Sequence, residues 1–294
     1  MDPRPTESRH PASPGLHARG AEAILSDLLA AQQAALRALE PALPALAAVA
    51  EAGAHVLGRG GRFGYAGAGS SWLMALADAL ELPGTFGIPP DRVPVLFAGG
   101  TGALLHMTGA VEDDPALARA DFAAAELRAG DVVLCLSASG STPYTMEIAA
   151  LARTAGVTVA GIANVAGSAL LRAADLPVLL ETGPEIVTGS TRMGAATAQK
   201  AALNTLSALV GIRLGHVHDG YMVNVVADNA KLRDRAVRIV CALSGADIET
   251  ARAALETTGG AVKPAVLVAR GRTAAEAAED LTNSRGHLAR WLNG

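Results

Sequence analysis

From Gly58 to about residue 180, short apolar runs that end in Gly or Ser alternate with helical stretches, and this alternation constrains the fold more than any other feature. Short strands that alternate with helices form parallel βαβ units, because parallel neighbours need a long crossover connection. The pattern therefore predicts an α/β fold with a doubly wound five-stranded parallel sheet flanked by helices. The predicted strands are residues 62–66, 93–98, 131–137, 157–163 and 176–180.

Helical segments are expected on both sides of this sheet. Leucines at helical spacing within residues 21–57 predict two helices, divided near Pro41 and Pro44, whose amphipathic face needs a partner surface. Residues 1–20, rich in Pro, Ser, His and Arg, are expected to form a tail.

After the sheet, residues 221–243 are predicted to form one long helix, followed by a small helical subdomain. We therefore expect three parts. These are an N-terminal tail and helices at 1–57, a ligand-binding α/β domain at 58–220 and a C-terminal helical region at 221–294.

Composition excludes several classes of function. The net charge is -4 and only 3% of residues are aromatic, so neither a basic surface for nucleic acid or anionic membrane nor a stacking platform for bases is indicated. Two distant cysteines, Cys135 and Cys241, do not suggest a disulfide framework. Neither a signal peptide nor a membrane span is expected from the apolar runs. We expect a cytoplasmic protein that acts on a small molecule.

The first predicted strand leads into the sequence Gly67-Ala68-Gly69-Ser70-Ser71-Trp72. Backbone N–H groups at a helix start and two hydroxyls suit a phosphate, so we predict binding by Gly69, Ser70 and Ser71. Two alternatives stay open: a simple strand-to-helix turn, or a dinucleotide loop, although Trp72 holds the place of the third glycine.

A second loop rich in hydroxyls follows the third predicted strand. Its predicted phosphate ligands are Ser137, Ser139, Gly140, Ser141 and Thr142, and Pro143 can begin the next helix. Turn and helix-capping residues have the same chemistry, which is the alternative. Two such loops after different strands of one sheet are more specific than either alone, and together they predict a pocket for a phosphorylated small molecule.

A third segment, residues 185–193, supplies further hydroxyls and one fixed cation, so Ser190, Thr191 and Arg192 are candidate substrate ligands.

The ordered set of motifs resembles the N-acetylmuramic acid 6-phosphate etherase family, which has a sugar isomerase (SIS) fold and is related to the glucokinase regulatory protein. The resemblance extends from about Thr6 to the C-terminus. The motifs are Gly67–Ser71, Ser137–Tyr144, Val187–Met193, Ala198-Gln199-Lys200 and Asn229-Ala230-Lys231-Leu232.

The resemblance implies a lyase that cleaves the D-lactyl ether of N-acetylmuramic acid 6-phosphate in peptidoglycan recycling. The products would be N-acetylglucosamine 6-phosphate and D-lactate. The resemblance implies neither a metal nor an organic cofactor. It implies that residues 58–220 are the SIS sugar-phosphate-binding domain, and it adds Lys231 to the candidate substrate ligands.

The family's two catalytic glutamates match Glu81 and Glu112. In an open-chain sugar the C1 aldehyde acidifies the C2 proton, so one carboxylate can remove it, while another acid protonates the departing oxygen at C3 before water adds there. The resemblance implies that Glu81 is the acid and base at C3 and Glu112 the base at C2. From the residues alone, a solvent-facing helical Glu81 and a solvated acidic loop at Glu112 remain open.

Glu81 lies too far along its helix to serve the phosphate loop at the helix start. Ten residues separate Ser71 from Glu81, about 15 Å at a rise of ~1.5 Å per residue, which is longer than a hexose phosphate spans. Either the chain folds back after Glu81, or Glu81 serves the pocket of a second subunit. We favour a homodimer with a shared active site, because SIS proteins that resemble this chain are dimers.

Several basic residues of the family are absent here. Trp72 and Leu73 stand where the family has a glycine and an arginine, Ser141 replaces an arginine, and Gly194 replaces a lysine. A changed acyl or sugar group therefore stays open, as do a non-catalytic sugar-phosphate sensor and an aldose–ketose isomerase.

His216 and His218 have a metal-like spacing. No third cluster of ligands lies nearby in the sequence. A polar loop at a subunit boundary is the favoured alternative.

Overall fold

The apolar runs form one parallel sheet with the strand order β2-β1-β3-β4-β5. The structure is a computed structural model that describes residues 5–106 and 108–292. All five predicted strands are present, so the α/β prediction is confirmed. The strands are β1 (Phe63–Gly67), β2 (Val95–Phe97), β3 (Val132–Leu136), β4 (Thr158–Ala163) and β5 (Leu176–Leu179).

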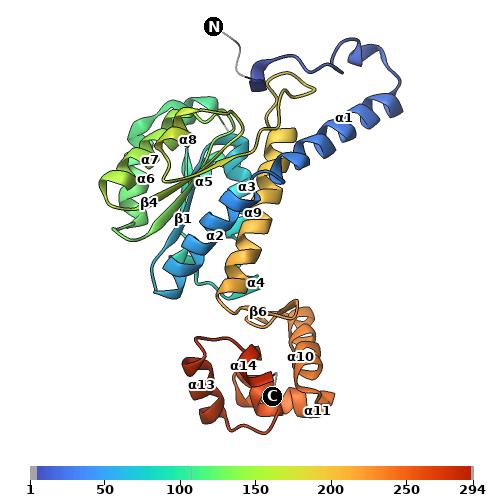
Figure 1. Ribbon diagram of the computed structural model, residues 1–294, viewed down its shortest axis with the longest axis vertical. Coiled ribbons are helices and arrows are strands. Elements are labelled where there is room, and N and C mark those ends of the chain that lie inside the picture. The colour runs from blue at the N-terminus through green and yellow to red at the C-terminus, as the bar shows by residue number, and fades with distance from the viewer. Residues whose placement is uncertain (1–4, 107, 293–294) are drawn as a thin grey trace. The chain divides into compact units, whose positions relative to one another are not determined.

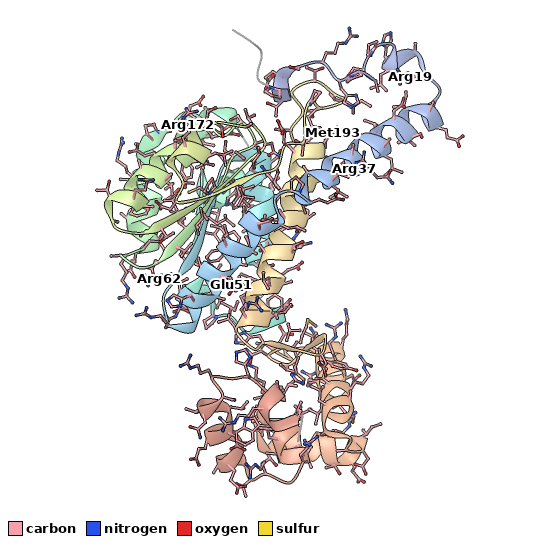
Figure 2. The ribbon with its side chains drawn as sticks, in the orientation of Figure 1. Arg19, Arg37, Glu51, Arg62, Arg172 and Met193 are labelled. Atoms are coloured by element: carbon pink, nitrogen blue, oxygen red, sulfur yellow. The ribbon has the colours of Figure 1, made fainter. Side chains whose placement is uncertain are left out.

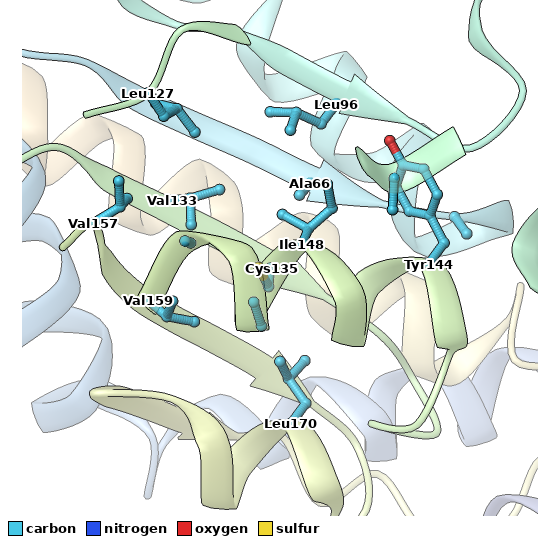
Figure 3. Close-up of a cluster of buried hydrophobic side chains, with 14 of the residues drawn as sticks. Ala66, Leu96, Leu127, Val133, Cys135, Tyr144, Ile148, Val157, Val159 and Leu170 are labelled. Atoms are coloured by element: carbon cyan, nitrogen blue, oxygen red, sulfur yellow. The ribbon is translucent and has the colours of Figure 1, made fainter. Parts of the chain in front are cut away.

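One face of the sheet is covered by α6 (Pro115–Ala125), α7 (Pro143–Thr154) and α8 (Ala169–Ala173) (Figure 1). Figure 3 shows Ile148 of α7 packed over the strand residues Ala66 and Cys135. Side chains from both faces of the central strands are buried, as expected of a parallel sheet covered by helices.

The other face packs against α2 (Leu43–Gly58) and α3 (Gly69–Ala79). α1 (Ala21–Leu36) precedes α2, and the two predicted N-terminal helices are thus confirmed. Residues 5–20 form turns and two short 3-10 helices, and Ser13 Oγ donates to the Ile186 carbonyl at 2.7 Å. Residues 1–4 of the predicted tail lie outside the described residues.

A segment that crosses a bilayer must be long and apolar enough to span its hydrocarbon core. Over residues 5–106 and 108–292, no single helix is long and apolar enough to do so, and the bent pair Ala21–Leu39 with Leu43–Gly58 reaches that length and composition only when the two helices are taken together.

The chain divides into two compact units. The sheet unit comprises the described parts of Met1–Ala79 and Asp91–Ser207, and the second unit comprises those of Leu80–Pro90 and Ala208–Gly294. The long helix α9 (Gly194–Arg213) begins in the sheet unit and ends in the second unit.

The second unit is mainly helical. Its core contains buried Val223, Val240, Ala251, Val266 and Ala277. Its elements are α4 (Leu82–Phe86), β6 (Val217–His218), β7 (Tyr221–Met222), α10 (Ala230–Ser244), α11 (Ile248–Thr257), α12 (Val262–Ala269), α13 (Ala274–Asn283) and α14 (Ala289–Leu292).

The prediction of one helix over residues 221–243 is wrong at its start. Asp219 and Gly220 both have positive φ, 46° and 79°, and join β6 to β7 in an antiparallel pair. Two positive φ angles are typical of a tight hairpin turn, for which Asp-Gly is a favoured sequence. The helix begins only at Ala230, where the Asn229 side chain accepts a hydrogen bond from the Leu232 N–H at 3.0 Å.

Candidate active site

The first predicted phosphate loop connects β1 to α3. Gly69 begins α3 with φ +57°, a left-handed conformation that glycine adopts without steric cost. Ser71 is buried and Ser70 is partly exposed in the same first turn. The first N–H groups of an α-helix have no acceptor within the helix, so this turn can donate to an anion.

The Glu112 carboxylate lies against this loop. Glu112 belongs to η5 (Gly109–Asp113), and a Cβ placed on Gly69 would be only 2.7 Å from Glu112 Oε1. The absence of a side chain at Gly69 therefore provides the space that the carboxylate occupies. Burial of Glu112, and secondarily the charge of Asp113, raises the pKa of the Glu112 carboxyl above its usual value.

The second hydroxyl-rich loop lies beside the first. β1 and β3 are neighbours in the sheet, with Gly67 in register with Leu136, so the loops that follow them leave the same edge at adjacent positions. η5 and α7 also contact each other, so the segment that carries Glu112 lies close to the helix that follows the second loop. The sheet thus brings together the two predicted phosphate loops and Glu112.

Ser137 is the centre of the second loop's hydrogen bonds. Its buried Oγ accepts from the Gly140 N–H at 3.0 Å and lies 2.8 Å from Thr142 Oγ1. Ser139 Oγ accepts from the Ser141 hydroxyl at 3.1 Å. These contacts fix the turn before any ligand binds, which lowers the ordering cost of binding.

Gly140 allows the second loop to approach α8 closely. Its φ is +64°, and a Cβ there would lie 2.1 Å from Ser168 Oγ. The Leu170 N–H donates to the Gly140 carbonyl at 2.9 Å, so the loop is joined to α8. Even alanine at residue 140 would displace the loop or the helix.

The third segment ends at the start of α9, where Figure 2 labels Met193. Buried Glu185 accepts hydrogen bonds from the Gly194 N–H at 2.9 Å and the Ala195 N–H at 2.8 Å. Glu185 therefore caps α9 and is not a free catalytic acid. The loop before the helix carries the predicted substrate ligands Ser190, Thr191 and Arg192, the last of which is exposed.

Asn164, directly after β4, is a site-supporting residue that sequence reasoning missed. Its N–H donates to the Ala138 carbonyl in the second loop at 3.0 Å, and its Oδ1 accepts from Gln199 Nε2 at 2.9 Å. Asn164 thus connects β4, the second loop and α9. Its position one residue beyond a parallel strand, at the edge where ligands bind, was the available signal.

The structure gives local reasons for two departures from the family pattern. Trp72 is 2% exposed and stacks on Phe97, so it packs between α3 and β2. A Cβ on Gly194 would lie 3.1 Å from both Ala35 Cβ and Glu185 Oε2, which leaves little room for a longer side chain. Exposed Ser141 stays in the second loop, bonded to Ser139.

Glu81 and Lys231 belong to the second unit. Glu81 is exposed and occupies the N-cap position of α4 without a capping hydrogen bond from its side chain. Lys231 is exposed in the first turn of α10. Within the described ranges no group of three or more His, Cys, Asp or Glu side chains is arranged to hold a metal ion, including the region of His216 and His218.

Comparison with known proteins identifies the fold of the sheet unit. The SIS domain family model matches residues 28–164. A solved structure from Bacteroides fragilis, described as a phosphosugar isomerase involved in capsule formation, superposes with a TM-score of 0.53 at 21% identity. The match covers 69% of this chain and 95% of that one. Both comparisons thus give the sheet unit the fold of a SIS domain.

Several relatives match nearly the whole chain. The N-acetylmuramic acid 6-phosphate etherase of Deinococcus radiodurans is 45% identical over 287 residues, which are 97% of this chain and 94% of that protein. The etherase of Serratia proteamaculans is 41% identical over 284 residues, 96% of each chain. The chain belongs to the N-acetylmuramic acid 6-phosphate etherase family.

Proposed function

We propose that this protein cleaves the D-lactyl ether of N-acetylmuramic acid 6-phosphate, releasing D-lactate and N-acetylglucosamine 6-phosphate. The observation that carries the proposal is the position of Glu112, half-buried and with a raised pKa, against the glycine that begins the first phosphate loop. A carboxyl group with a raised pKa beside an anion-binding turn suits acid–base chemistry on a phosphorylated substrate.

The two loops of residues 58–220 would bind the phosphoryl group. The N–H groups of the first turn of α3 and the hydroxyls of Ser139, Ser141 and Thr142 are the donors, while Ser137 maintains the turn. Ser190, Thr191, Arg192 and Lys231 are proposed as further substrate ligands. Arg192 is the cation in this set that best suits the lactyl carboxylate, because a guanidinium can form two parallel hydrogen bonds to it.

The proposed reaction is an elimination followed by an addition. In the open-chain form of the sugar, the Glu112 carboxylate removes the C2 proton, and the electron pair left on C2 is delocalised toward the C1 aldehyde. Glu81 then protonates the ether oxygen as the C3–O bond breaks, and D-lactate leaves. Water adds to C3 with Glu81 acting as the base, while a proton returns to C2.

A direct test is incubation of the protein with N-acetylmuramic acid 6-phosphate and measurement of D-lactate. We expect D-lactate to appear in equal amount to N-acetylglucosamine 6-phosphate, with oxygen from ¹⁸O-water at C3 of the sugar. Binding without turnover would favour a sugar-phosphate sensor, and ketose formation without lactate would favour an isomerase. Either result would contradict the proposed function.

We further propose a homodimer in which Glu81 of one protomer serves the phosphate loops of the other. Support comes from α1, in which Ala35 is the only buried residue. Leu25, Leu29 and Leu36 are 66%, 60% and 40% exposed and lie at spacings of four and seven residues, on one helix face. An apolar stripe of this kind is typical of an interface between subunits.

Subunit mixing tests the shared site. Glu81→Gln and Gly140→Ala are each expected to be inactive alone, because one lacks the acid at C3 and the other distorts the second loop. A mixed dimer would contain one site with neither defect, so mixing is expected to restore up to about a quarter of wild-type activity under random exchange. No recovery after demonstrated subunit exchange would contradict sharing but leave the proposed reaction intact.

We also propose that the protein acts in the cytoplasm. Both cysteines, Cys135 and Cys241, are free, as is common in a reducing compartment. Cell fractionation followed by immunodetection is the test, and recovery in an extracellular fraction would contradict it.

A further inference from the structure

The second unit contains a buried lysine that the proposed reaction does not use. Lys263 is the second residue of α12 and only 7% exposed. Its ammonium group forms neither a hydrogen bond nor an ion pair with any residue in the described ranges. Buried charges in proteins are normally paired, because burial without a partner is unfavourable.

Two histidines lie close to this ammonium group. Gly286 lies next to the ammonium group, since a Cβ placed on Gly286 would be 3.3 Å from Lys263 Nζ. The next residue is His287, and its ring lies against Gly215, 2.9 Å from the position that a Cβ on Gly215 would take. His216 follows Gly215, and its Nδ1 is buried without a hydrogen-bond partner. Three basic side chains from separate segments of the second unit therefore converge.

The cluster is basic, and within the described ranges no carboxylate pairs with the ammonium group of Lys263. Burial, the charge of Lys263 and the charge of His287 lower the pKa of His216 to about 4, although a hydrogen bond with the Phe86 backbone raises it. Burial lowers the pKa of Lys263 to about 8. The buried carboxylate of this unit, Asp280, is engaged by Arg272 at 2.8 Å.

Lys263 also contributes to the wall of a pocket of about 500 Å³. The wall is formed largely by the apolar residues Val223, Val225, Val226, Val262 and Leu281, with the glycine turn Gly259–Gly260. Asp228, the carboxylate on this wall, accepts a hydrogen bond from the Asn229 side chain at 2.9 Å. A small molecule in this pocket would contact Lys263, whereas His216 and His287 do not line the pocket.

We propose that Lys263, His216 and His287 form a binding site for a small anion, either a carboxylate or a phosphoryl group, that enters through this pocket. The ammonium group supplies the charge, and an anion next to Nδ1 of His216 favours the imidazolium form, in which Nδ1 carries a proton and donates while the bond to the Phe86 backbone is kept. The residues of this site all belong to the second unit, whereas the two predicted phosphate loops belong to the sheet unit.

A purely structural lysine is the competing explanation. The Cβ position of Gly286 is also 3.9 Å from the Leu214 carbonyl, just beyond the last turn of α9, and a cation near a helix C-terminus is stabilised by the helix dipole. That role requires no ligand. It therefore predicts that added anions leave the lysine and both histidines unaffected.

The test is nuclear magnetic resonance of the full chain with labelled histidine and lysine. Inorganic phosphate and acetate are added separately at constant ionic strength, and assignments come from His216→Gln, His287→Gln and Lys263→Arg. We expect the signals of His216, His287 and the Lys263 ε-carbon to shift with saturation. A bound anion offsets the neighbouring positive charges, so the pKa of His216 is expected to rise by about one unit. A stronger response to phosphate assigns a phosphoryl ligand, and a stronger response to acetate a carboxylate.

Variants separate recognition by Lys263 from general ion effects. Lys263→Met is expected to lose the saturable shifts, Lys263→Arg to keep them, and Arg270→Met, which removes an exposed cation at the end of the same helix, to behave as wild type. Unchanged signals in the wild-type chain with both ions would overturn the proposal, as would equal shifts in Lys263→Met. If Lys263→Met does not fold, the wild-type and Lys263→Arg titrations decide. The D-lactate assay remains an independent test of the proposed reaction.

Discussion

The segment around Glu112 and the segment around Glu81 differ in how tightly each carboxylate is held. Glu112 is half-buried against Gly69, and the surroundings raise the pKa of its carboxyl group. Glu81 is exposed at the start of α4, and its side chain does not cap that helix. The first carboxylate is positioned by its own unit, whereas the second is not.

This difference indicates how the two proposed roles are divided. The proposed proton removal at C2 needs a base held close to the predicted phosphate-binding loops, and Glu112 of the sheet unit has that position. The proposed proton donation at C3 falls to exposed Glu81, and in the proposed homodimer a second subunit would supply its surroundings. Variants that change one carboxylate at a time test this difference.

The largest expected effect comes from replacing each carboxylate. Glu112→Gln and Glu81→Gln should each lower D-lactate release by about 10²–10⁴-fold, the usual range for loss of a general acid or base. In deuterated water, Glu81→Gln should still exchange the C2 proton, because its base remains, whereas Glu112→Gln should not.

Glu126→Gln is the matched control, because this exposed residue at the end of α6 forms an ion pair with Arg62 at 3.1 Å. Its activity should stay within about threefold of wild type. Exchange at C2 in Glu112→Gln but not in Glu81→Gln would reverse the proposed roles.

A smaller effect is expected from Gly69→Ala, which acts on Glu112 indirectly. The added methyl would lie 2.7 Å from Glu112 Oε1 on a backbone with φ +57°, so the carboxylate must move and the turn is strained. We expect kcat/KM to fall about 10–100-fold and stability to fall by about 1 kcal/mol. Steady-state kinetics and urea unfolding measure the two effects.

Gly109→Ala provides the comparison within η5, because a Cβ there meets no atom within 4 Å and φ is not positive. Gly109→Ala should change neither kcat/KM nor the free energy of unfolding appreciably. Full activity in Gly69→Ala would show that contact with Gly69 does not position Glu112.

The sequence predicted the sheet well because buried parallel strands leave a strong pattern. The apolar runs end close to the observed ends of β1 and β3, and the hydroxyl-rich loops follow directly. The prediction places the start of α10 too early, because residues 221–222 pair with 217–218 in a hairpin whose turn is Asp219-Gly220. Burial of Trp72 against Phe97 could not be predicted, since it depends on how α3 packs on β2.

The candidate site was predicted in its parts but not in its contacts. Local sequence indicated hydroxyl-rich loops, and the family resemblance indicated Glu112. Neither indicates that Glu112 lies against Gly69, or that Asn164 connects the second loop to Gln199, because these contacts join residues far apart in the chain. Such contacts are set by tertiary packing, which single-sequence patterns do not encode.

The smallest expected effect is a pH-dependent gain in stability in Glu112→Gln. In the unfolded chain this carboxyl group ionises near its ordinary pKa of 4.5, whereas the folded chain holds the proton to higher pH. Between these two pKa values the native state binds more protons than the unfolded state, so the contribution of Glu112 to stability falls as pH rises through that window. Glutamine has no charge to bury, so the stability of Glu112→Gln relative to wild type should increase as pH rises.

Thermal unfolding from pH 4 to pH 8 measures this trend, and Glu126→Gln controls for changing a carboxylate to an amide. Because Glu112 is only half-buried, we expect a gain in melting temperature of about 1–2 °C at the upper end of the range and none at the lower end. A gain that is equal at every pH would point to repacking around residue 112. A melting temperature of Glu112→Gln that falls further below wild type as pH rises would mean that the ionised Glu112 carboxylate is stabilised where it lies against Gly69. The pKa of Glu112 would then not be raised, and it could not account for the difference between Glu112 and the unconstrained Glu81.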